Sequence, residues 1–536
     1  MNTEKETEKG FSRRNFIKTT AVGVGATVLT GFEPKNANAQ NKPIVDNWDK
    51  EADVVVIGYG GAGIVAAITA HDEGAKVLVL EKAPFRGGGN TAMSFGQCSC
   101  PTNVEDAAAY LYAGCGGNDP GGSLTPKDVI DAWAEEVCKN KEWWDKMCIE
   151  HKVMTRAWTE FPDLPGASAM IFLDPEGKGQ AVFSTLDKHV KNRGIEVLFD
   201  SPATELIQDP DTKQILGVKA KSKREDKKIK AKRGVILCTG GFEFNEEMKK
   251  DFLKCYPMKF YGWKYNTGDG VKMAQMVGAD LWHMDMCAGG SCAWFPEDPL
   301  NVGYAVGLRS NNYILVDRSG RRYASERDML DHHKGWIRYS EFSLEEVGYT
   351  RIPTYMIFDE TARKAGSINE SFEFIGREIL PAELGGQPKW SEDNMAEIEK
   401  GWIKKGNTIE SLAAAIGEKV DPVLLKKSVE TYNSYCAAGK DPEFGRDART
   451  LKPVEAPPFY AVALYPGMVC THGGARRNGK AQILDPYKKP IPRLYSAGSF
   501  GSVYGRIYCV TAGNIGEVFA FGRIAGRNAA AESPWS

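Results

Sequence analysis

The sequence has almost no excess of charge of either sign. Its 68 Lys and Arg residues are balanced by 70 Asp and Glu residues, which leaves a formal net charge of -2. A nucleic acid is a polyanion that needs a broad basic face, so this balance argues against nucleic-acid binding. The one dense basic run, residues 219–233 (KAKSKREDKKIKAKR), contains Glu225 and Asp226 and lies between two strand-like segments. We interpret it as a solvated hairpin.

The chain also lacks a long hydrophobic run. No segment approaches the roughly 20 apolar residues of a membrane-spanning helix, so we predict that the protein is not an integral membrane protein. Its 12 cysteines lack the spacing of a disulfide framework or of a four-ligand zinc site, and we predict no metal centre. No C-x-x-C-H sequence is present, so the chain attaches no c-type haem.

The N-terminus has the parts of an export signal in the usual order. Residues 12–18 (SRRNFIK) resemble the twin-arginine pattern of bacteria, residues 21–32 form a glycine-diluted apolar run, and residues 37–39 (ANA) resemble a cleavage site. We predict a signal peptide at 1–39, a linker at 40–50 and export by the twin-arginine (Tat) machinery. The expected location is the periplasm or another extracytoplasmic compartment.

Hydrophobic patterning predicts an α/β fold after the linker. Residues 53–57 (DVVVI) and 76–80 (KVLVL) are short apolar runs typical of buried parallel strands, and residues 62–71 between them have helical spacing. This order opens a doubly wound, Rossmann-like sheet. Further strands are expected at 194–199 and 234–237, and further helices at 104–112, 126–147, 268–276 and 513–531.

The composition changes in the middle of the chain. Residues 283–456 are more aromatic and irregular, and a strand-rich pattern resumes at about residue 457. We therefore predict a discontinuous α/β domain at 51–282 and 457–536, with an inserted α+β capping domain at 283–456.

A G-x-G-x-x-G motif, residues 58–63 (GYGGAG), follows the first strand and opens the first helix. In this context Gly58 makes the tight turn, Gly60 lets a pyrophosphate approach the backbone, and Gly63 lets the helix pack on the sheet. Glu81 ends the second strand, where its carboxylate can accept hydrogen bonds from ribose hydroxyls. The pattern predicts a dinucleotide site, occupied by either FAD or NAD.

Four further segments decide between the two cofactors by resemblance. Residues 86–91 (RGGGNT), 235–242 (VILCTGGF), 267–271 (TGDGV) and 492–498 (PRLYSAG) resemble segments of the flavoprotein family of soluble fumarate reductases, urocanate reductases and 3-ketosteroid dehydrogenases. The resemblance covers residues 50–530 and implies FAD and a cap; a nicotinamide-only dehydrogenase and a non-catalytic flavin carrier stay as alternatives. The residues implied to bind FAD are Gly58, Gly60, Gly61, Ala62, Gly63, Glu81, Lys82, Gly88, Gly89, Asn90, Thr91, Ala203, Thr239, Gly240, Asp269, Gly498, Asn514 and Ile515.

The same resemblance implies the reaction. Members of the family move a hydride between the flavin and one carbon of an activated C–C bond, and a proton to or from its neighbour. Residues 313–326 (YILVDRSGRRYASE) and 355–363 (YMIFDETAR) resemble segments that carry a relay acid and a donor arginine in fumarate reductases. The resemblance therefore makes Glu326 and Arg363 catalytic candidates.

Tyr508 is a third catalytic candidate. It falls where ketosteroid dehydrogenases have a tyrosine that polarises the substrate carbonyl, together with a glycine N–H whose place is taken here by Ala512. Fumarate reductases carry a carboxylate-binding histidine where this chain has Cys470, and only Arg506 remains as a possible carboxylate clamp. A dicarboxylate needs two cationic partners, so fumarate is an unfavourable substrate.

Two reactions follow from this pattern. The first is respiratory reduction of a C=C bond conjugated to a carbonyl or carboxylate, in the periplasm. Since the chain has no haem motif, we expect a separate cytochrome c or similar electron donor. The second is the reverse reaction, in which a ketosteroid-like dehydrogenase desaturates a cyclic ketone with the help of Tyr508.

Overall fold

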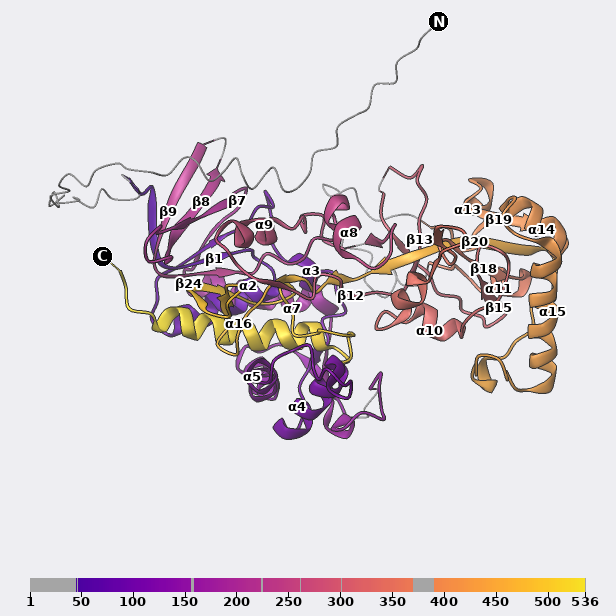
Figure 1. Cartoon of the computed structure of the whole chain (residues 1–536), viewed down its shortest axis with the longest axis horizontal. Helices are drawn as coiled ribbons and strands as arrows, with labels where there is room; N and C mark the ends of the chain where they lie inside the picture. Colours follow the sequence, from indigo (N-terminus) through magenta and orange to yellow (C-terminus); the bar gives the residue numbers. More distant parts are fainter. Residues whose placement is uncertain are drawn as a thin grey trace, which may run out of the picture. The chain divides into compact units, whose positions relative to one another are not determined.

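The computed structural model describes residues 45, 47–155, 159–222, 225–260, 262–299, 301–369 and 390–535. The predicted signal peptide lies outside the described residues. Residues from Asn47 onward form one compact unit, whose main elements are shown in Figure 1.

The first sheet is built around parallel strands, as the apolar runs predict. β1 (Lys50–Ile57) lies between β2 (Val77–Leu80) and β9 (Glu225–Leu237) and is parallel to both. β6 (Glu196–Leu198) extends the sheet beyond β2, and β24 (Pro490–Ser496) extends it beyond β9. The strand order β23-β24-β9-β1-β2-β6 is therefore assembled from both ends of the chain. The remaining strands are β7 (Ala203–Gln208), β8 (Ile215–Ser222) and β23 (Gln482–Leu484).

The predicted basic hairpin is confirmed, because β8 and β9 pair antiparallel across it, from Gly217↔Lys230 to Ser222↔Glu225. Its lysines alternate along the strands and are mostly half-buried or exposed.

Two helices from opposite ends of the chain pack tightly on this sheet. α2 (Gly61–Asp72) and α16 (Gly513–Ala531) lie side by side, and Figure 1 shows α16 running along β24. Glycines make the close approach possible. A Cβ on Gly522 would lie 2.9 Å from Val65 Cβ, and one on Gly526 would lie 2.6 Å from Ala66 O. Any larger residue at these positions would push the helices apart.

The other helices of this region surround the sheet and the segments beside it. They are α3 (Gly89–Ala92), α4 (Val104–Tyr112), α5 (Lys127–Val137), α6 (Asn140–Lys146), α7 (Lys178–Asn192), α8 (Glu246–Phe252) and α9 (Asp269–Met276). A small sheet of β3 (Cys98–Ser99), β5 (Phe172–Pro175) and β4 (His151–Met154) lies among them.

A second sheet is formed by strands of the predicted cap. Its central strand, β20 (Phe459–Met468), pairs antiparallel with β18, β13 and β19. β20 starts just after the predicted cap boundary at residue 456, yet it pairs with cap strands, as does the short β10 (Lys259–Phe260). The boundaries themselves stay predictions. The remaining strands are β13 (Ser291–Ala293), β14 (Tyr304–Ala305), β15 (Tyr313–Val316), β18 (Thr354–Phe358) and β19 (Ile403–Gly406).

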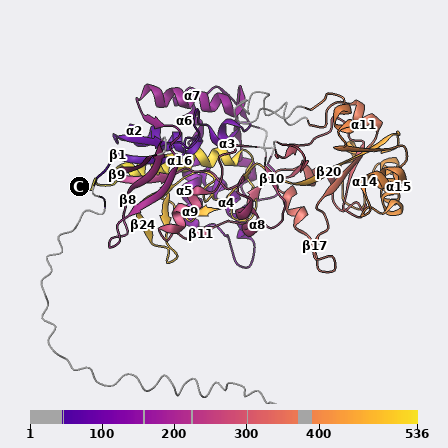
Figure 2. The ribbon, with the colours of Figure 1, turned by 90° about the horizontal axis from the view of Figure 1, so that it is seen from above.

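Helix α14 (Ile409–Ile416) packs against β19 and β20, and α15 (Pro422–Ala438) packs against α14 and β15; Figure 2 shows both helices near β20. Asp421 caps α15 by accepting hydrogen bonds from Val423 N and Leu424 N, and Pro422 occupies the first turn, where it costs no hydrogen bond. A separate core of buried aliphatic and aromatic side chains joins these helices to the sheet.

The remaining cap helices are α10 (Glu326–Leu330), α11 (Glu360–Lys364) and α13 (Met395–Glu399). Three strand pairs complete the fold: β11 (Leu281–Trp282) with β22 (Gly474–Ala475), β12 (Cys287–Ala288) with β21 (Cys470–Thr471), and β16 (Phe342–Ser343) with β17 (Gly348–Tyr349). Among the described residues, no helix combines the length and apolarity needed to cross a bilayer.

Candidate active site

A cavity lies at the carboxyl ends of the parallel strands. Residues at or just after the ends of β1, β2, β9 and β24 line it, namely Ile57, Leu80, Cys238 and Ala497. The cavity is open to solvent, and its lining runs from the glycine turn after β1 to Asp269 at the start of α9. Ligands of doubly wound sheets bind at this edge.

The glycine motif shapes one wall of the cavity with backbone alone. Gly58 has a φ of +102°, and a Cβ there would lie 2.3 Å from Cys238 O. A Cβ on Gly63 would lie 1.9 Å from Gly58 O, so the strand–helix turn closes only without side chains. Gly60, Gly61 and Ala62 at the N-terminus of α2 line the cavity, where the positive end of the helix would favour the pyrophosphate of a bound dinucleotide.

Glu81 is held in place by main-chain donors. Its Oε2 accepts from Tyr59 N and its Oε1 from Ala83 N, both at 2.8 Å. Burial raises the pKa of Glu81 even though these hydrogen bonds lower it. Each carboxylate oxygen keeps a further lone pair for a ribose hydroxyl. Lys82 Nζ contacts Asp269 at 2.6 Å, which places both predicted residues at the same end of the cavity.

Most of the residues that the resemblance assigned to FAD line this cavity. These are Gly58, Gly60, Gly61, Ala62, Glu81, Lys82, Gly89, Asn90, Thr91, Ala203, Thr239, Gly240, Asp269 and Gly498. Thr239 Oγ1 is buried without a hydrogen-bond partner among the described residues, which leaves it available to a ligand. The polar lining groups and the glycine turn fit FAD.

Four of the assigned residues lie outside the lining. Gly63 packs α2 against the turn, and Gly88 N donates to Tyr59 O at 2.9 Å. Asn514 and Ile515 lie in the first turn of α16, and Asn514 contacts His472 and Cys470. The pattern did not predict several lining residues, namely Tyr59, Cys238, Ser201, Trp263, Tyr265, Asn266, Met273, Ser499 and Val518.

Tyr508 lies in a buried aromatic cluster beside the N-terminus of α16. Its hydroxyl accepts a hydrogen bond from Asn514 N at 3.1 Å, so the hydroxyl proton is free to point elsewhere. The ring of His333, from the cap, stacks on the Tyr508 ring with centroids 4.5 Å apart, and Tyr504 meets it edge-on at 5.1 Å. Burial raises the pKa of Tyr508 far above its ordinary value, so the phenol stays protonated and can donate.

Cys470, His472 and Asn514 connect this cluster to the FAD cavity. Asn514 Oδ1 lies 3.1 Å from His472 Nε2, and Asn514 Nδ2 lies 3.1 Å from Cys470 Sγ. Burial lowers the pKa of His472 to about 3, so its ring is neutral, and its Nδ1 has no partner among the described residues. Asn90, which lines the cavity, donates to Val469 O next to Cys470 at 3.3 Å. These contacts place Tyr508 one layer of side chains from the cavity.

Glu243 is a buried carboxyl next to the cavity-lining residue Asn90, whose Nδ2 donates to its Oε1 at 3.5 Å. It accepts from Thr471 N at 2.9 Å, while its second oxygen has no partner among the described residues. Burial raises the pKa of Glu243 to about 7. A group with such a pKa can hold or release a proton near neutral pH.

Ala512 preserves the backbone geometry that the resemblance associates with glycine. It is the N-cap of α16 and has φ +58° and ψ 18°, the left-handed conformation. A Cβ in this region costs about 1–2 kcal/mol, and the surrounding structure maintains the conformation. Alanine therefore replaces the glycine of the family pattern at position 512, but the left-handed turn is kept.

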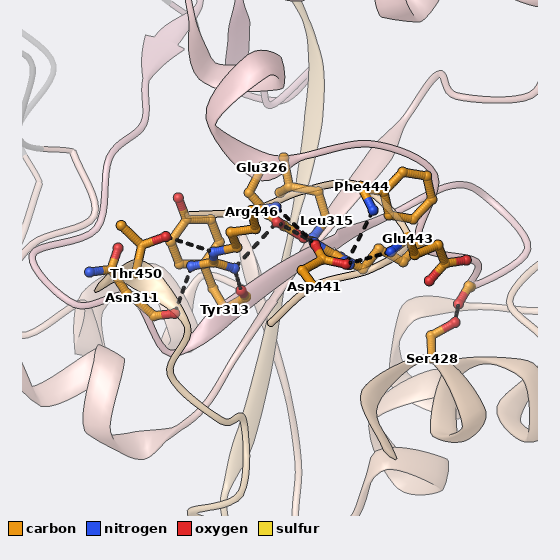
Figure 3. A network of polar contacts seen from close by, with 12 residues as sticks. Asn311, Tyr313, Leu315, Glu326, Ser428, Asp441, Glu443, Phe444, Arg446 and Thr450 are labelled. Atoms are coloured by element: carbon orange, nitrogen blue, oxygen red, sulfur yellow. Dashed lines mark hydrogen bonds and ion pairs between the residues drawn. The ribbon is translucent and has the colours of Figure 1, made fainter. Parts of the chain in front are cut away.

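Glu326 lies inside the cap in a buried ion-pair network (Figure 3). Its carboxylate accepts from Arg322 Nε at 2.7 Å, and Arg446 Nη1 lies 3.3 Å away. Arg322 also donates to Asp441 at 2.7 Å. The contacts of Glu326 among the described residues are with cap residues, so its role as a relay acid stays a prediction.

The two predicted arginines are both paired with carboxylates. Arg363 Nε donates to Glu360 at 2.6 Å on α11, and Arg506 contacts Asp119 with both side chains half exposed. Neither is shown to reach Tyr508. The role of Arg363 as a proton donor therefore stays a prediction.

The resemblance did not identify three residues of the Tyr508 cluster. All three contact Tyr508: His333, His472 and Tyr504. The two histidines belong to segments distant from Tyr508 in sequence, and Tyr504 is close to it but lies in no family motif. The only signal was the C-T-H-G-G segment at 470–474, which contains His472.

A family model described as an FAD binding domain matches residues 53–514 of the chain. Two relatives come from Eggerthella lenta. The chain is 29% identical to a urocanate reductase, covering 99% of this chain and 83% of that protein, and 28% identical to a digoxin reductase, covering 98% of each.

The fold matches a solved structure, the 3-ketosteroid Δ1-dehydrogenase of Sterolibacterium denitrificans, with a TM-score of 0.76. The identity is 24%, and the match covers 90% of this chain and 100% of that one, so it supports the fold alone. The predicted α/β architecture with FAD-binding and capping domains is confirmed. The chain belongs to the FAD binding domain family and is an FAD-dependent oxidoreductase that acts on CH–CH bonds.

Proposed function

We propose that this protein is an exported reductase that saturates a C=C bond conjugated to a carbonyl or a single carboxylate, and that it uses this substrate, not fumarate, as a respiratory electron acceptor. The observation that carries the proposal is the buried, protonated Tyr508 hydroxyl at the N-terminus of α16. A hydroxyl donor at a positive helix end stabilises the negative charge that develops on a conjugated carbonyl oxygen during hydride addition.

Charge around the site supports a substrate other than a dicarboxylate. Arg363 and Arg506 are each neutralised by an acidic partner, and Cys470 is a buried thiol whose pKa is raised by burial. His472 is neutral for the same reason. A dianion would therefore lose its hydration without meeting two fixed cations.

Bound FAD supplies the hydride that adds to the β-carbon. Tyr508 holds the carbonyl oxygen, and the chain must then place a proton on the α-carbon. Glu243, with a pKa near 7, and the cap residues Glu326 and Arg363 are the candidates for that step. The aromatic rings of Tyr504, Tyr508 and His333 exclude water from the reacting carbons.

The two relatives support the direction of reduction, because both carry reductase names. The second candidate is dehydrogenation of a cyclic ketone. Tyr508 and the left-handed turn at Ala512 favour it, since the same hydroxyl would stabilise an enolate during desaturation.

The deciding experiment is an anaerobic assay of the FAD-loaded protein with reduced methyl viologen. The acceptors are fumarate, monocarboxylic enoates, aryl enoates, cyclic enones and steroid enones. We expect fast dye oxidation with at least one enoate or enone and none with fumarate. Dye reduction by a saturated ketone, with no acceptor active, would support the dehydrogenase instead.

Tyr508→Phe tests the role of the hydroxyl in either direction. We expect kcat to fall by about 10²–10³, the usual cost of removing one oxyanion donor, with FAD content unchanged. Tyr487→Phe is the control, because Tyr487 is 83% exposed. Unchanged turnover in Tyr508→Phe would remove the basis of the proposal.

Export and the electron donor are tested separately. With the twin-arginine residues replaced (Arg13→Lys with Arg14→Lys), we expect the protein to stay in the cytoplasm, whereas the natural sequence reaches the periplasm. We also expect a periplasmic cytochrome c, reduced beforehand, to reduce the bound flavin. Equal periplasmic recovery of both forms, or a flavin that no cytochrome reduces, would contradict these parts of the proposal.

A further inference from the structure

One loop of the cap, residues 331–333 (DHH), lies against Tyr508. The nitrogen and oxygen atoms of Asp331, His332 and His333 that could bind a metal all lie within 4.8 Å of one another. Glu160, which is distant in sequence, adds a fourth group, since its Oε1 lies 3.5 Å from His333 Nε2. A three-residue cluster of two imidazoles and a carboxylate thus has a second carboxylate, from a distant segment, beside His333.

His333 is oriented as a metal ligand. Its Nδ1 lies 2.7 Å from the main-chain oxygen of Tyr508, and since a carbonyl can only accept, Nδ1 carries the proton. Its Nε2 therefore presents a lone pair toward the Glu160 carboxylate. Metal-binding histidines characteristically donate their other N–H to a carbonyl or carboxylate in this way. Two acceptor atoms that face each other at this distance need a cation or a proton between them.

The spacing also suits a divalent ion. Metal–nitrogen and metal–oxygen bonds of about 2.0–2.2 Å in a tetrahedral site put neighbouring ligand atoms about 3.3–3.5 Å apart. Asp331 Oδ1 accepts a hydrogen bond from His333 N at 2.8 Å, which leaves Oδ2 available to a metal. The neighbouring cation, Lys334, is closer to Asp328 (3.1 Å) than to Asp331 Oδ2 (3.9 Å), so its charge is shared between the two carboxylates.

We propose that Glu160, Asp331, His332 and His333 form a binding site for a divalent first-row transition metal such as Zn²⁺. Mixed imidazole and carboxylate ligands favour this class over Ca²⁺ or Mg²⁺. The site joins the cap loop to the segment of Glu160 in the predicted FAD domain. Because the His333 ring lies flat on Tyr508, the metal fixes the cap over the active site. The inference does not depend on the proposed substrate or reaction direction.

The test is Zn²⁺ titration of the FAD-loaded, EDTA-treated protein by calorimetry, with bound metal counted by mass spectrometry. The exposed thiol Cys148 is first removed as Cys148→Ser, since it could bind zinc independently. We expect one Zn²⁺ per chain and a concentration-dependent rise in the unfolding temperature, as for any ligand that binds only the folded state.

Two variants locate the site. His332→Ala changes an exposed side chain and so spares the core, and Glu160→Gln keeps the shape of the residue. Each should weaken Zn²⁺ binding by about 10-fold or more, since even second-layer partners of metal sites cost 10–100-fold. His71→Ala is the matched control, because His71 also faces a carboxylate, Asp72, at 3.5 Å but has no further ligand.

Binding of less than one-fifth of an equivalent by the Cys148→Ser protein would overturn the proposal. Binding that both His332→Ala and Glu160→Gln retain at full strength would overturn it as well. Because the titration needs no turnover, its failure is distinguishable from failure of the viologen assay.

Discussion

The FAD cavity and the cap of this protein are each stabilised by a different kind of contact. Around the FAD cavity, backbone approaches backbone, and Gly58 and Gly63 leave no room for a side chain. In the cap, Arg322, Glu326 and Asp441 form a buried network of charged side chains (Figure 3). The FAD cavity therefore requires glycines, which have no Cβ, whereas the cap requires every member of its ion-pair network.

The two arrangements also respond differently to burial. In the cap, burial acts to raise the pKa of Asp441, but hydrogen bonds from Arg322 and the backbone outweigh it and hold the pKa at about 2. Beside the cavity, Glu243 has no cation in hydrogen-bond contact, and burial raises its pKa to about 7. Similar burial therefore gives a stable anion in one region and a titratable acid in the other.

Gly63→Ala should have the largest effect on FAD binding. Its Cβ would lie 1.9 Å from Gly58 O, a rigid main-chain atom, so the turn must open. We expect FAD affinity to fall more than about 100-fold, equivalent to roughly 3 kcal/mol, as measured by flavin retention on dialysis. Gly121→Ala is the control, because no atom lies within 4 Å of its added Cβ. Full flavin content in Gly63→Ala would show that the turn tolerates a side chain.

Glu326→Gln tests how much the buried ion-pair network of the cap contributes to the free energy of unfolding. It removes one charge from a buried network, which typically costs about 3–5 kcal/mol, so the free energy of unfolding in urea should fall by that order while FAD is retained. Asp447→Asn, at the exposed pair with Arg449, should leave the urea midpoint unchanged. If Glu326 is also the relay acid, kcat per folded molecule will fall too; a change in stability alone would assign it a structural role.

The pH dependence of stability should separate the two carboxyl groups. The pKa of Glu243 is raised on folding, so its contribution is greatest below about pH 4.5 and is lost as the pH rises toward 7, by about 3 kcal/mol in total. Glu243→Gln should therefore flatten the thermal stability profile between pH 4.5 and 7, whereas Glu73→Gln, at an exposed position, should not. A profile that keeps its slope in Glu243→Gln would refute the assignment.

Asp441 should show the opposite sign. Its pKa is lowered on folding, so its contribution is present above about pH 4 and is lost as the pH falls toward 2. Asp441→Asn should lower stability at neutral pH and weaken the loss of stability in acid. Unfolding curves of both proteins at pH 2.5, 4 and 7 provide the check.

Arg363→Gln should have the smallest effect on stability. Its partner Glu360 lies one turn away on the same short helix, and such pairs contribute at most about 1 kcal/mol. If Arg363 is the proton donor, kcat should show the usual 10²–10⁴-fold loss when a general acid is removed, and a change of less than about threefold would exclude it from that role. A loss within that larger range would instead establish Arg363 as the proton donor.

Local patterns predicted the nucleotide half of the fold well. The structure places α4 at Val104–Tyr112 and α16 at Gly513–Ala531, the ranges expected from helical spacing, and fourteen of the assigned FAD residues line the cavity. These features are readable because each depends on neighbours in sequence: a strand, a glycine turn and a helix start. The predicted helix at 126–147 is divided into α5 and α6, a break that the spacing did not reveal.

The cluster around Tyr508 was only partly predictable. Tyr508 was identified by the resemblance to ketosteroid dehydrogenases, whereas His333 contacts it from a segment 175 residues away, and Glu160 contacts His333 from a third segment. The same holds for β20, which follows the predicted cap in sequence yet pairs with cap strands.

The sequence by itself therefore determined the dinucleotide site and the doubly wound sheet, because glycine spacing and apolar runs act over a few residues, and its resemblance to a flavoprotein family supplied the cofactor and the class of reaction. Tertiary structure alone decided which charges are neutralised, which acid has a pKa near 7, and which cap residues lie over Tyr508. Those properties arise from burial and from pairing between distant segments, and neither is encoded in local spacing.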